Sequence, residues 1–447
     1  MTTTVWPSAT PEPSAADRVQ RALALLERAR QHTLAIIAPL SYEDVAAQHD
    51  PLMSPILWDL GHIAAFEKLW LLQNLDGPIE FSEMPGTYNP FEHPRAVRGA
   101  LSLPTLAGQR DELARVRQAV RTRLANEKFD ASKPLMRDAY VVRMVAQHER
   151  QHQETILQTL QLKQGDPYEP SRALPLPRGR PSEIEGAMVL CKGGRVRIGT
   201  DDRSESYDNE RPAHDVELAP FFIDITAVTN GAYREFVDNG GYDIRQYWSD
   251  AGWAWRTESN TRAPKHWAQD SKGQWRVRAL DRVERLDPLR PVCHVCFYEA
   301  EAYAKSVGKR LPTEQEWEAA ATWNPEHARQ QQYPWGDEPL TPEFANVDQL
   351  SFGVSQVNAY RKNVSPIGCY GMIGDVWEWT SSDFAGYPGF TAFPYPEYSE
   401  VFFGNEYKVL RGGSWATAAD VARPTFRNWD YPIRRQIFAG FRCARDA

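Results

Sequence analysis

Apolar residues recur at intervals of three and four positions along the first third of the chain, which is the period of an amphipathic helix. The Ser54-Pro55 pair adds a helix-start signal before one of these stretches. With one longer connection, residues 76–104, the pattern predicts a four-helix bundle over residues 17–163. The four predicted helices span residues 17–38, 56–75, 106–126 and 140–162.

From residue 185 onward, short β-like runs rich in glycine and tryptophan replace the long helical pattern. Residues 298–306 and 313–321 have the pattern of short helices among these runs. Residues 164–184 contain five prolines and are too polar for a core element, which is typical of a stiff linker. We therefore predict an α+β protein of two domains, in which an irregular domain over residues 185–447 follows the bundle.

Length and composition agree with two globular domains. The chain has 447 residues, and a single core rarely grows beyond about 250–300 residues. The net charge of −8 argues against a nucleic-acid or anionic-membrane partner, and no apolar run approaches the ~18 residues of a membrane span. Five cysteines are too few for a disulfide framework, so we expect a cytoplasmic protein. Residues 1–16 lack the features of a signal peptide and are predicted to be a disordered tail.

Two smaller motifs in the second half favour a structural explanation. Residues 247–275 carry five tryptophans among arginines and lysines, which could stack on nucleic-acid bases, but the negative net charge favours a loop braced by aromatic side chains. The CHVC run from Cys293 to Cys296 resembles half of a zinc motif. Because no second Cys or His pair follows at finger spacing, we expect two packed thiols.

The last predicted helix of the bundle carries the strongest sign of chemistry. His148 and His152 lie four positions apart, so both side chains are on one helix face, about one turn apart. Two neutral imidazoles in this arrangement can bind one divalent metal ion. The alternative is a helix whose two histidines only mark a polar boundary.

Two other kinds of metal site share parts of this pattern. HERQH is also the H-E-x-x-H motif of zinc proteases, in which Glu149 would act as the general base. The extended motif requires a glycine and a third histidine, but Thr155 and Gln158 occupy these positions. A di-iron site would require a second E-x-x-H motif, which only Asp59 and His62 approximate. A single metal ion therefore remains the preferred interpretation.

The second half of the chain resembles the formylglycine-generating-enzyme, or sulfatase-modifying-factor, domain, which has a C-type-lectin-like fold. The matching runs include GGRVRIGTDD, YDNERPAHDVEL, GKRLPTEQEWEAAA, GCYGMIGDVWEWTSS and VLRGGSW, within residues 185–442. The copper-binding cysteine pair of that family has no counterpart here, so its oxidase chemistry is not implied.

The first half resembles a DinB-type bundle through HDPLMSPILWDLGHIAAFEKLWLL and HERQHQETILQ. A DinB-like bundle fused ahead of the second domain is the architecture of the sulfoxide synthases of ergothioneine biosynthesis, and FRNWDYPIRRQIFAG is specific to them. The resemblance implies a non-haem iron(II) enzyme that uses O2 to join the sulfur of a cysteine derivative to imidazole C2 of hercynine, Nα-trimethylhistidine, as a sulfoxide.

The same resemblance implies the roles of individual residues. The iron ligands would be His62, His148 and His152, which leaves about three positions open for O2 and a thiolate. Tyr395 matches the tyrosine that relatives place near the iron as a proton donor. The residues matched to hercynine are Gln151, Tyr398 and Trp429, and those matched to the carboxylates and ammonium of γ-glutamylcysteine are Arg95, Arg98, Asp430 and Arg434.

Several alternatives remain open at this point. Free cysteine, or the selenosugar of a selenoneine synthase, could replace γ-glutamylcysteine at the same iron. The four matched donor residues favour the dipeptide, although arginines in loops often form surface ion pairs. A non-catalytic ligand-binding protein is the other class, but such a protein would not need the three histidines and Tyr395. We expect a monomer that takes only small molecules: hercynine, the thiol and O2.

Overall fold

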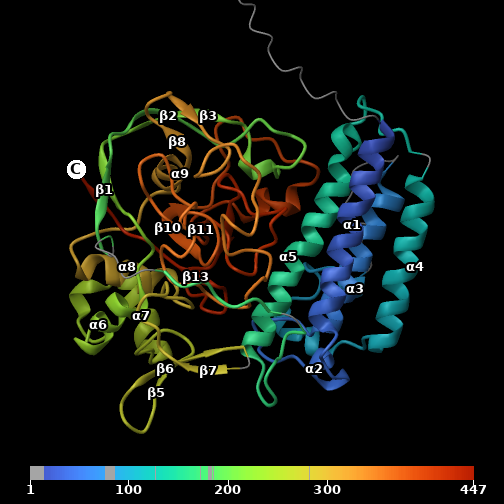
Figure 1. Ribbon diagram of the computed structural model, residues 1–447. Helices are drawn as coiled ribbons and strands as arrows, with labels where there is room; N and C mark the ends of the chain where they lie inside the picture. Colours follow the sequence, from blue (N-terminus) through green and yellow to red (C-terminus); the bar gives the residue numbers. More distant parts are fainter. Residues whose placement is uncertain are drawn as a thin grey trace, which may run out of the picture.

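The computed structural model describes residues 15–75, 86–125, 127–171, 173–179, 184, 186–280 and 282–447. The N-terminal bundle stands on one side of the molecule and the C-terminal domain on the other (Figure 1). The bundle consists of the four predicted helices α1 (Ala15–Ile37), α3 (Ile56–Lys68), α4 (Leu106–Leu124) and α5 (Tyr140–Leu162), together with the short α2 (Tyr42–Ala46).

The helix ends follow local signals in the sequence. Thr105 caps α4 by accepting a hydrogen bond from the Gly108 amide, and Pro55 precedes the first residue of α3. The predicted second helix changes at its end into a π-helical segment, Leu69–Gln73. Of the predicted tail, residues 15 and 16 belong to α1, and residues 1–14 lie outside the described part of the chain.

The core of the bundle contains charged side chains as well as apolar ones. Arg30 of α1 pairs with Glu67 of α3 at 2.7 Å and with Glu149 of α5 at 2.9 Å. Arg117 of α4 also pairs with Glu67, at 2.6 Å. All four side chains are buried, so each charge needs these partners. The cluster therefore holds all four long helices together.

The C-terminal domain is built from short strands and loops. A four-stranded sheet has the order β12-β11-β10-β13 and a three-stranded sheet the order β1-β4-β14. Its strands are β1 (Met188–Cys191), β2 (Gly194–Ile198), β3 (His214–Leu218), β4 (Phe221–Asp224), β5 (Trp267–Gln269), β6 (Trp275–Ala279), β7 (Arg282–Arg285), β8 (Trp323–Asn324), β9 (Arg329–Gln330), β10 (Trp377–Asp383), β11 (Lys408–Arg411), β12 (Asn428–Asp430), β13 (Ala439–Gly440) and β14 (Ala444–Asp446). Its helices are α6 (Asn230–Asp238), α7 (Asp250–Ser259), α8 (Phe297–Ser306) and α9 (Glu314–Thr322).

Helix α5 joins the two domains. It lies on the side of the bundle that faces the C-terminal domain (Figure 1). The buried Glu154 carboxylate accepts hydrogen bonds from Trp377 at 2.7 Å, from Ser414 at 2.9 Å and from Thr417 at 2.8 Å. At the end of α5, Arg278 donates to backbone carbonyls of the last turn. The helix with the histidine pair is thus fixed from both sides.

One prediction for the second half differs from the structure. The tryptophan-rich segment is not a loop, because it forms α7 and the strands β5 and β6, with Trp248 and Trp267 buried in the core. Cys296 is buried and Cys293 is half-buried, and neither is in a disulfide. The described residues of the predicted linker, 164–184, contain neither helix nor strand.

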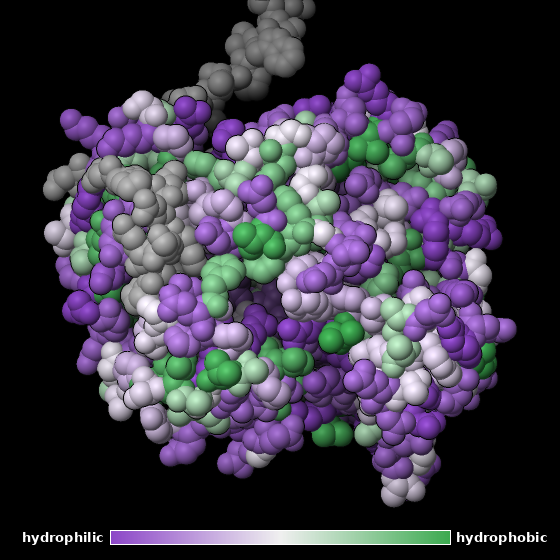
Figure 2. Space-filling model, turned by 180° about the vertical axis from the view of Figure 1, so that it is seen from behind, coloured by the Kyte–Doolittle hydropathy of each residue, from purple (hydrophilic) through white to green (hydrophobic). Residues whose placement is uncertain are grey.

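The molecular surface is mixed in character. Hydrophobic side chains are scattered among hydrophilic ones on the face seen from behind, which is hollowed near its middle (Figure 2). None of the described helices has the length and apolar content needed to span a lipid bilayer.

Candidate metal centre and substrate pocket

Three histidines from two helices meet inside the bundle. His62 is on α3, and His148 and His152 are on α5. One nitrogen from each ring lies within 4.8 Å of the others, and His62 Nε2 is 3.2 Å from His148 Nε2. Among the residues that the structure describes, this is the one group of histidine, cysteine and acidic side chains with such geometry.

The outer nitrogens of two rings are held by acceptors. His62 Nδ1 lies 2.8 Å from the carbonyl oxygen of Tyr88, which can only accept, so this nitrogen carries the hydrogen. His152 Nδ1 lies 3.1 Å from Asp59 Oδ1, and the other oxygen of Asp59 is buried without a hydrogen bond to any described residue. Both contacts leave Nε2 with its lone pair, directed towards the centre of the group.

The protonation state of His62 and His148 also suits a metal ion. Burial lowers the pKa of His62 and of His148 well below the usual value, so both imidazoles are neutral at physiological pH. Phe66 stacks on His148 with 3.6 Å between ring centroids, and Trp58 stacks on His62 at 4.8 Å. Neutral, oriented imidazoles whose lone pairs converge fit one divalent metal ion.

The structure does not support the zinc-protease interpretation. A general base at Glu149 would have to reach water on the metal ion. The Glu149 carboxylate instead accepts from Arg30 at 2.9 Å and from Thr33 at 2.8 Å, inside the charged cluster of the bundle. A di-iron interpretation is not supported either, because Asp59 contacts the outer nitrogen of His152.

Tyr395 lies one aromatic ring away from the histidines, behind Phe66. Its ring stacks on Trp70 with 5.1 Å between centroids and lies 6.4 Å from Phe66, the residue that covers His148. Burial raises the pKa of the Tyr395 phenol well above the usual value, so the hydroxyl keeps its proton at neutral pH.

The residues matched to hercynine are also near one another. Gln151, one residue before His152, donates from Nε2 to the Tyr398 hydroxyl at 3.1 Å. Tyr398 meets Trp429 edge to face, with 5.8 Å between ring centroids. These contacts join α5 to strand β12 across the domain boundary.

The residues matched to the sulfur donor form two groups. In one, Asp430 and Arg434 are an ion pair at 3.4 Å. Burial raises the pKa of Asp430, and the charges of Arg434 and Arg95 oppose this rise. In the other, Arg98 stacks on Trp58, with Cζ 3.5 Å from the ring centroid. Burial lowers the pKa of Arg98 to about 10.

Arg434 has buried N–H groups that no described residue accepts from. Its Nε and Nη1 atoms are buried and make no hydrogen bond to any residue that the structure describes. The ion pair with Asp430 therefore lacks hydrogen-bond geometry at Nε, although the two side chains are close. A buried guanidinium with unused donors fits an anionic ligand, because an unsatisfied buried donor is costly.

Several residues beside the site were not identified from the sequence. Asp59 was considered only as part of a di-iron motif, although its position three residues before His62 was a usable signal. No local pattern pointed to Trp58, Phe66 or Tyr207, because their contacts depend on the packing of the folded chain.

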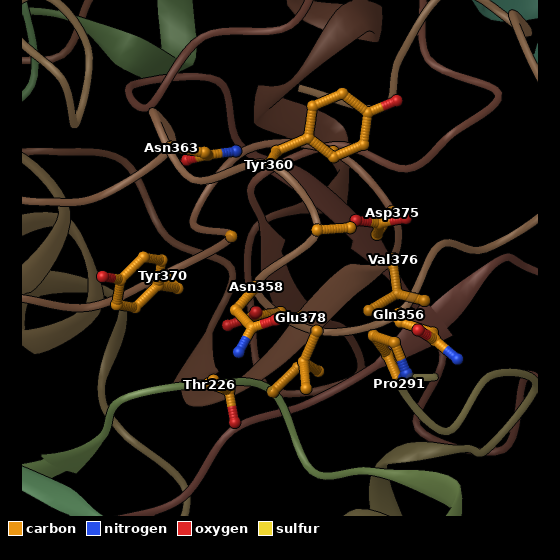
Figure 3. A pocket seen from close by; sticks show the side chains of 15 residues that line it. Thr226, Pro291, Gln356, Asn358, Tyr360, Asn363, Tyr370, Asp375, Val376 and Glu378 are labelled. Atoms are coloured by element: carbon orange, nitrogen blue, oxygen red, sulfur yellow. The ribbon is translucent and has the colours of Figure 1, made fainter. Parts of the chain in front are cut away.

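A separate cavity lies within the C-terminal domain (Figure 3). Its lining includes the carboxylates of Asp375 and Glu378, but no histidine or cysteine. Asp375 accepts from Asn346 at 2.7 Å, and Glu378 pairs with Arg442 at 2.6 Å. Because these acidic groups already have partners, the cavity offers no second metal centre.

Comparison with known proteins extends over both domains. Residues 25–156 match the DinB superfamily, and residues 174–447 match the sulfatase-modifying factor enzyme 1-like domain. Hercynine oxygenase of Mycolicibacterium thermoresistibile is 46% identical over 94% of this chain and 93% of its own length. Hercynine oxygenase of Mycobacterium tuberculosis is 44% identical over 94% of this chain and 97% of its own length. The formylglycine-generating enzyme of Thermomonospora curvata is 32% identical over 62% of this chain and 99% of its own length.

The fold and the histidine group together define a protein in which a DinB-type bundle with a candidate metal centre is fused to a sulfatase-modifying-factor domain, and its full-length relatives make it an oxygenase. Within this class, the hercynine oxygenases are similar to this chain over nearly its full length. The chain belongs to the hercynine oxygenase family.

Proposed function

We propose that this protein is an iron(II)-dependent sulfoxide synthase that joins the sulfur of γ-glutamylcysteine to imidazole C2 of hercynine. The observation that carries the proposal is the group of three oriented histidines next to the matched substrate residues. In the overall reaction, the thiol S–H and the imidazole C2–H are replaced by a C–S bond. One atom of O2 enters the sulfoxide, and the other leaves as water with both hydrogens.

His62, His148 and His152 would hold the iron, and the neutral imidazoles of His62 and His148 support this role. Iron(II), when bound, supplies the redox chemistry that combines O2 with a thiolate. Because the three ligands are uncharged, the positive charge of the metal ion is not offset and attracts the thiolate. Tyr88 and Asp59 keep two of the rings in the orientation that this binding requires.

Hercynine would bind between α5 and β12. The Gln151 amide and the Tyr398 hydroxyl can hydrogen-bond the imidazole of the substrate, and they are already 3.1 Å apart. Its trimethylammonium group has no N–H to donate, so an aromatic face such as that of Trp429 suits it.

The dipeptide is the donor that the charges favour. γ-Glutamylcysteine carries two carboxylates and one ammonium group. Arg434 has unused buried donors for one carboxylate, Arg95 and Arg98 provide further positive charge, and Asp430 suits the ammonium. Free cysteine would occupy fewer of these groups, and a selenosugar lacks the matching charges.

Tyr395 would control which product forms. Its protonated hydroxyl can pass a proton to an oxygen atom on which negative charge develops. Without this proton, oxidation of the thiol alone, in which both atoms of O2 enter the sulfur as a sulfinate, becomes the easier outcome. Tyr398 is the alternative donor, although it already pairs with Gln151.

The proposal is tested by anaerobic reconstitution with iron(II), followed by mass spectrometry of the products. Hercynine is offered with γ-glutamylcysteine, with cysteine or with a selenosugar in the presence of O2. We expect the dipeptide sulfoxide as the main product. A faster reaction with cysteine or with the selenosugar would contradict the donor assignment, and no sulfoxide with any donor would contradict the proposed reaction.

A further inference from the structure

The two active-site tyrosines share one irregular segment. Tyr395 and Tyr398 lie between Phe393 and Ser399, where the regular structure is a single 3-10 turn, Pro396–Tyr398. The segment pairs with none of the strands that the structure describes. Its position therefore depends on the side chains that hold it.

A second turn, from Tyr207 to Glu210, forms hydrogen bonds to both ends of this segment. One oxygen of the buried Asp208 carboxylate accepts from the Phe393 amide at 3.1 Å, and the other accepts from the Ser399 hydroxyl at 2.5 Å. Asn209 donates to the same Ser399 hydroxyl at 3.0 Å. Asp208 thus bridges residues on either side of the two tyrosines.

The same turn is also tied to the helix with the histidine pair. Glu210 accepts from Arg423 at 2.8 Å, and the Arg423 guanidinium lies 3.4 Å from the side-chain oxygen of Gln147, next to His148 on α5. Tyr207 stacks on Tyr398 with 4.5 Å between ring centroids. The turn therefore contacts both the Phe393–Ser399 segment and, through Arg423, the helix with the histidine pair.

We propose that Asp208 is a positioning residue, which fixes the Phe393–Ser399 segment so that the Tyr395 hydroxyl stays where it can deliver its proton. This inference rests on the proposed function. Loosening the bridge would shift the reaction from the sulfoxide towards the sulfinate without removing any group that contacts a substrate.

A carboxylate suits this bridge better than an amide does. Both oxygens of an ionised Asp208 accept, so the Phe393 N–H and the Ser399 O–H are satisfied at once. An asparagine has only one accepting oxygen, so it can accept from only one of these two groups, and it carries no charge to strengthen either hydrogen bond. Asp208→Asn therefore keeps the shape of the side chain but weakens the bridge.

The experiment compares Asp208→Asn with the wild type by two readouts. Hydrogen exchange of the backbone amides in Phe393–Ser399, other than the two prolines, is followed in the metal-free and the iron-loaded protein. The ratio of sulfoxide to sulfinate is measured for the iron-loaded protein with hercynine and γ-glutamylcysteine. Ser399→Ala breaks the other end of the bridge, and Asp215→Asn, an exposed carboxylate on β3 that pairs with Arg195, is the matched control.

For Asp208→Asn we expect exchange of the Phe393 amide to accelerate by up to about 150-fold, the upper limit for a lost charge-assisted hydrogen bond. The sulfoxide fraction should fall, while the iron content and the KM for γ-glutamylcysteine stay within about twofold. The KM for hercynine should rise, because Tyr398 belongs to the same segment. Ser399→Ala should shift both readouts in the same direction, and Asp215→Asn neither.

Unchanged exchange in Asp208→Asn and Ser399→Ala would overturn the inference, whatever the products are. Faster exchange with an unchanged product ratio would also overturn it, because the bridge would then not act on Tyr395. If the wild type makes no sulfoxide, the proposed function fails, and the exchange measurement still decides whether Asp208 fixes the segment.

Discussion

At the scale of single residues, the Tyr395 hydroxyl is expected to decide the product. Tyr395→Phe keeps the ring that stacks on Trp70 and removes only the proton donor. General-acid assistance typically contributes ~10²–10⁴ in rate, so carbon–sulfur bond formation should fall by a factor in that range while oxygen consumption continues. The measurement is the sulfoxide-to-sulfinate ratio at saturating substrates. Tyr398→Phe should instead raise the KM for hercynine. An unchanged sulfoxide-to-sulfinate ratio in Tyr395→Phe would contradict the role of Tyr395 and indicate Tyr398 as the proton donor.

Arg434 should discriminate between the two organic substrates. Arg434→Gln removes a charge-assisted contact to a donor carboxylate, which should weaken γ-glutamylcysteine binding by ~1.5–3 kcal/mol, or about 10- to 150-fold. Hercynine affinity should change little. Calorimetric titration of each substrate measures both effects, with Arg445→Gln, an exposed arginine of β14, as the control. An equal loss for both substrates would contradict the assignment of Arg434 to the donor.

Asp208 should also leave a signature in the pH dependence of stability. Burial raises its pKa to about 6 in the folded protein, against an ordinary value of 3.8. The folded state therefore holds this proton more tightly, and the resulting stabilisation is fully present below about pH 4 and lost as the pH rises through about 6. The difference between the two pKa values, 3.8 and about 6, corresponds to about 3 kcal/mol in the free energy of unfolding. Asp208→Asn should lack this component in urea unfolding between these pH values, and an identical pH profile would contradict the shifted pKa.

At the scale of elements, the charged cluster of the bundle is expected to act on stability and not on chemistry. Glu149→Gln leaves Arg30 and Arg117 with only one buried carboxylate between them, Glu67. Breaking a buried ion pair costs about 3–5 kcal/mol, which urea unfolding measures. Glu112→Gln, in a surface pair with Arg115, should change the free energy of unfolding by less than about 1 kcal/mol. A stable Glu149→Gln protein without any turnover would contradict this role and favour a catalytic base.

Long helices could be predicted from the sequence because their apolar period repeats over several turns. Helix α5 has the predicted limits, Tyr140–Leu162, and α3 differs only where it changes into a π-helical segment. The strands of the second domain are only two to seven residues long, too short for a period to develop. Helix α7 is ten residues long, and it was predicted as part of a loop because its tryptophans were taken to brace an irregular segment.

At the scale of the whole molecule, the candidate site is assembled from parts that are far apart in the sequence. His148 and His152 could be found from their spacing, and the resemblance added the other site residues. The contact of Asp59 with His152 and the bridge from Asp208 to Phe393 and Ser399 could not be predicted. Each depends on how two distant segments pack, and no local pattern encodes such a contact.

The most direct test of the account is the behaviour of His62→Ala, because His62 is the ligand that links α3 to the histidine pair of α5. Iron content per chain and sulfoxide formation from hercynine and γ-glutamylcysteine are measured together, with His327→Ala in an exposed loop as the control. The account predicts a folded protein that has lost most of its iron and all sulfoxide formation, while His327→Ala keeps both. Full turnover in His62→Ala would contradict the three-histidine centre and with it the location of the chemistry in the bundle.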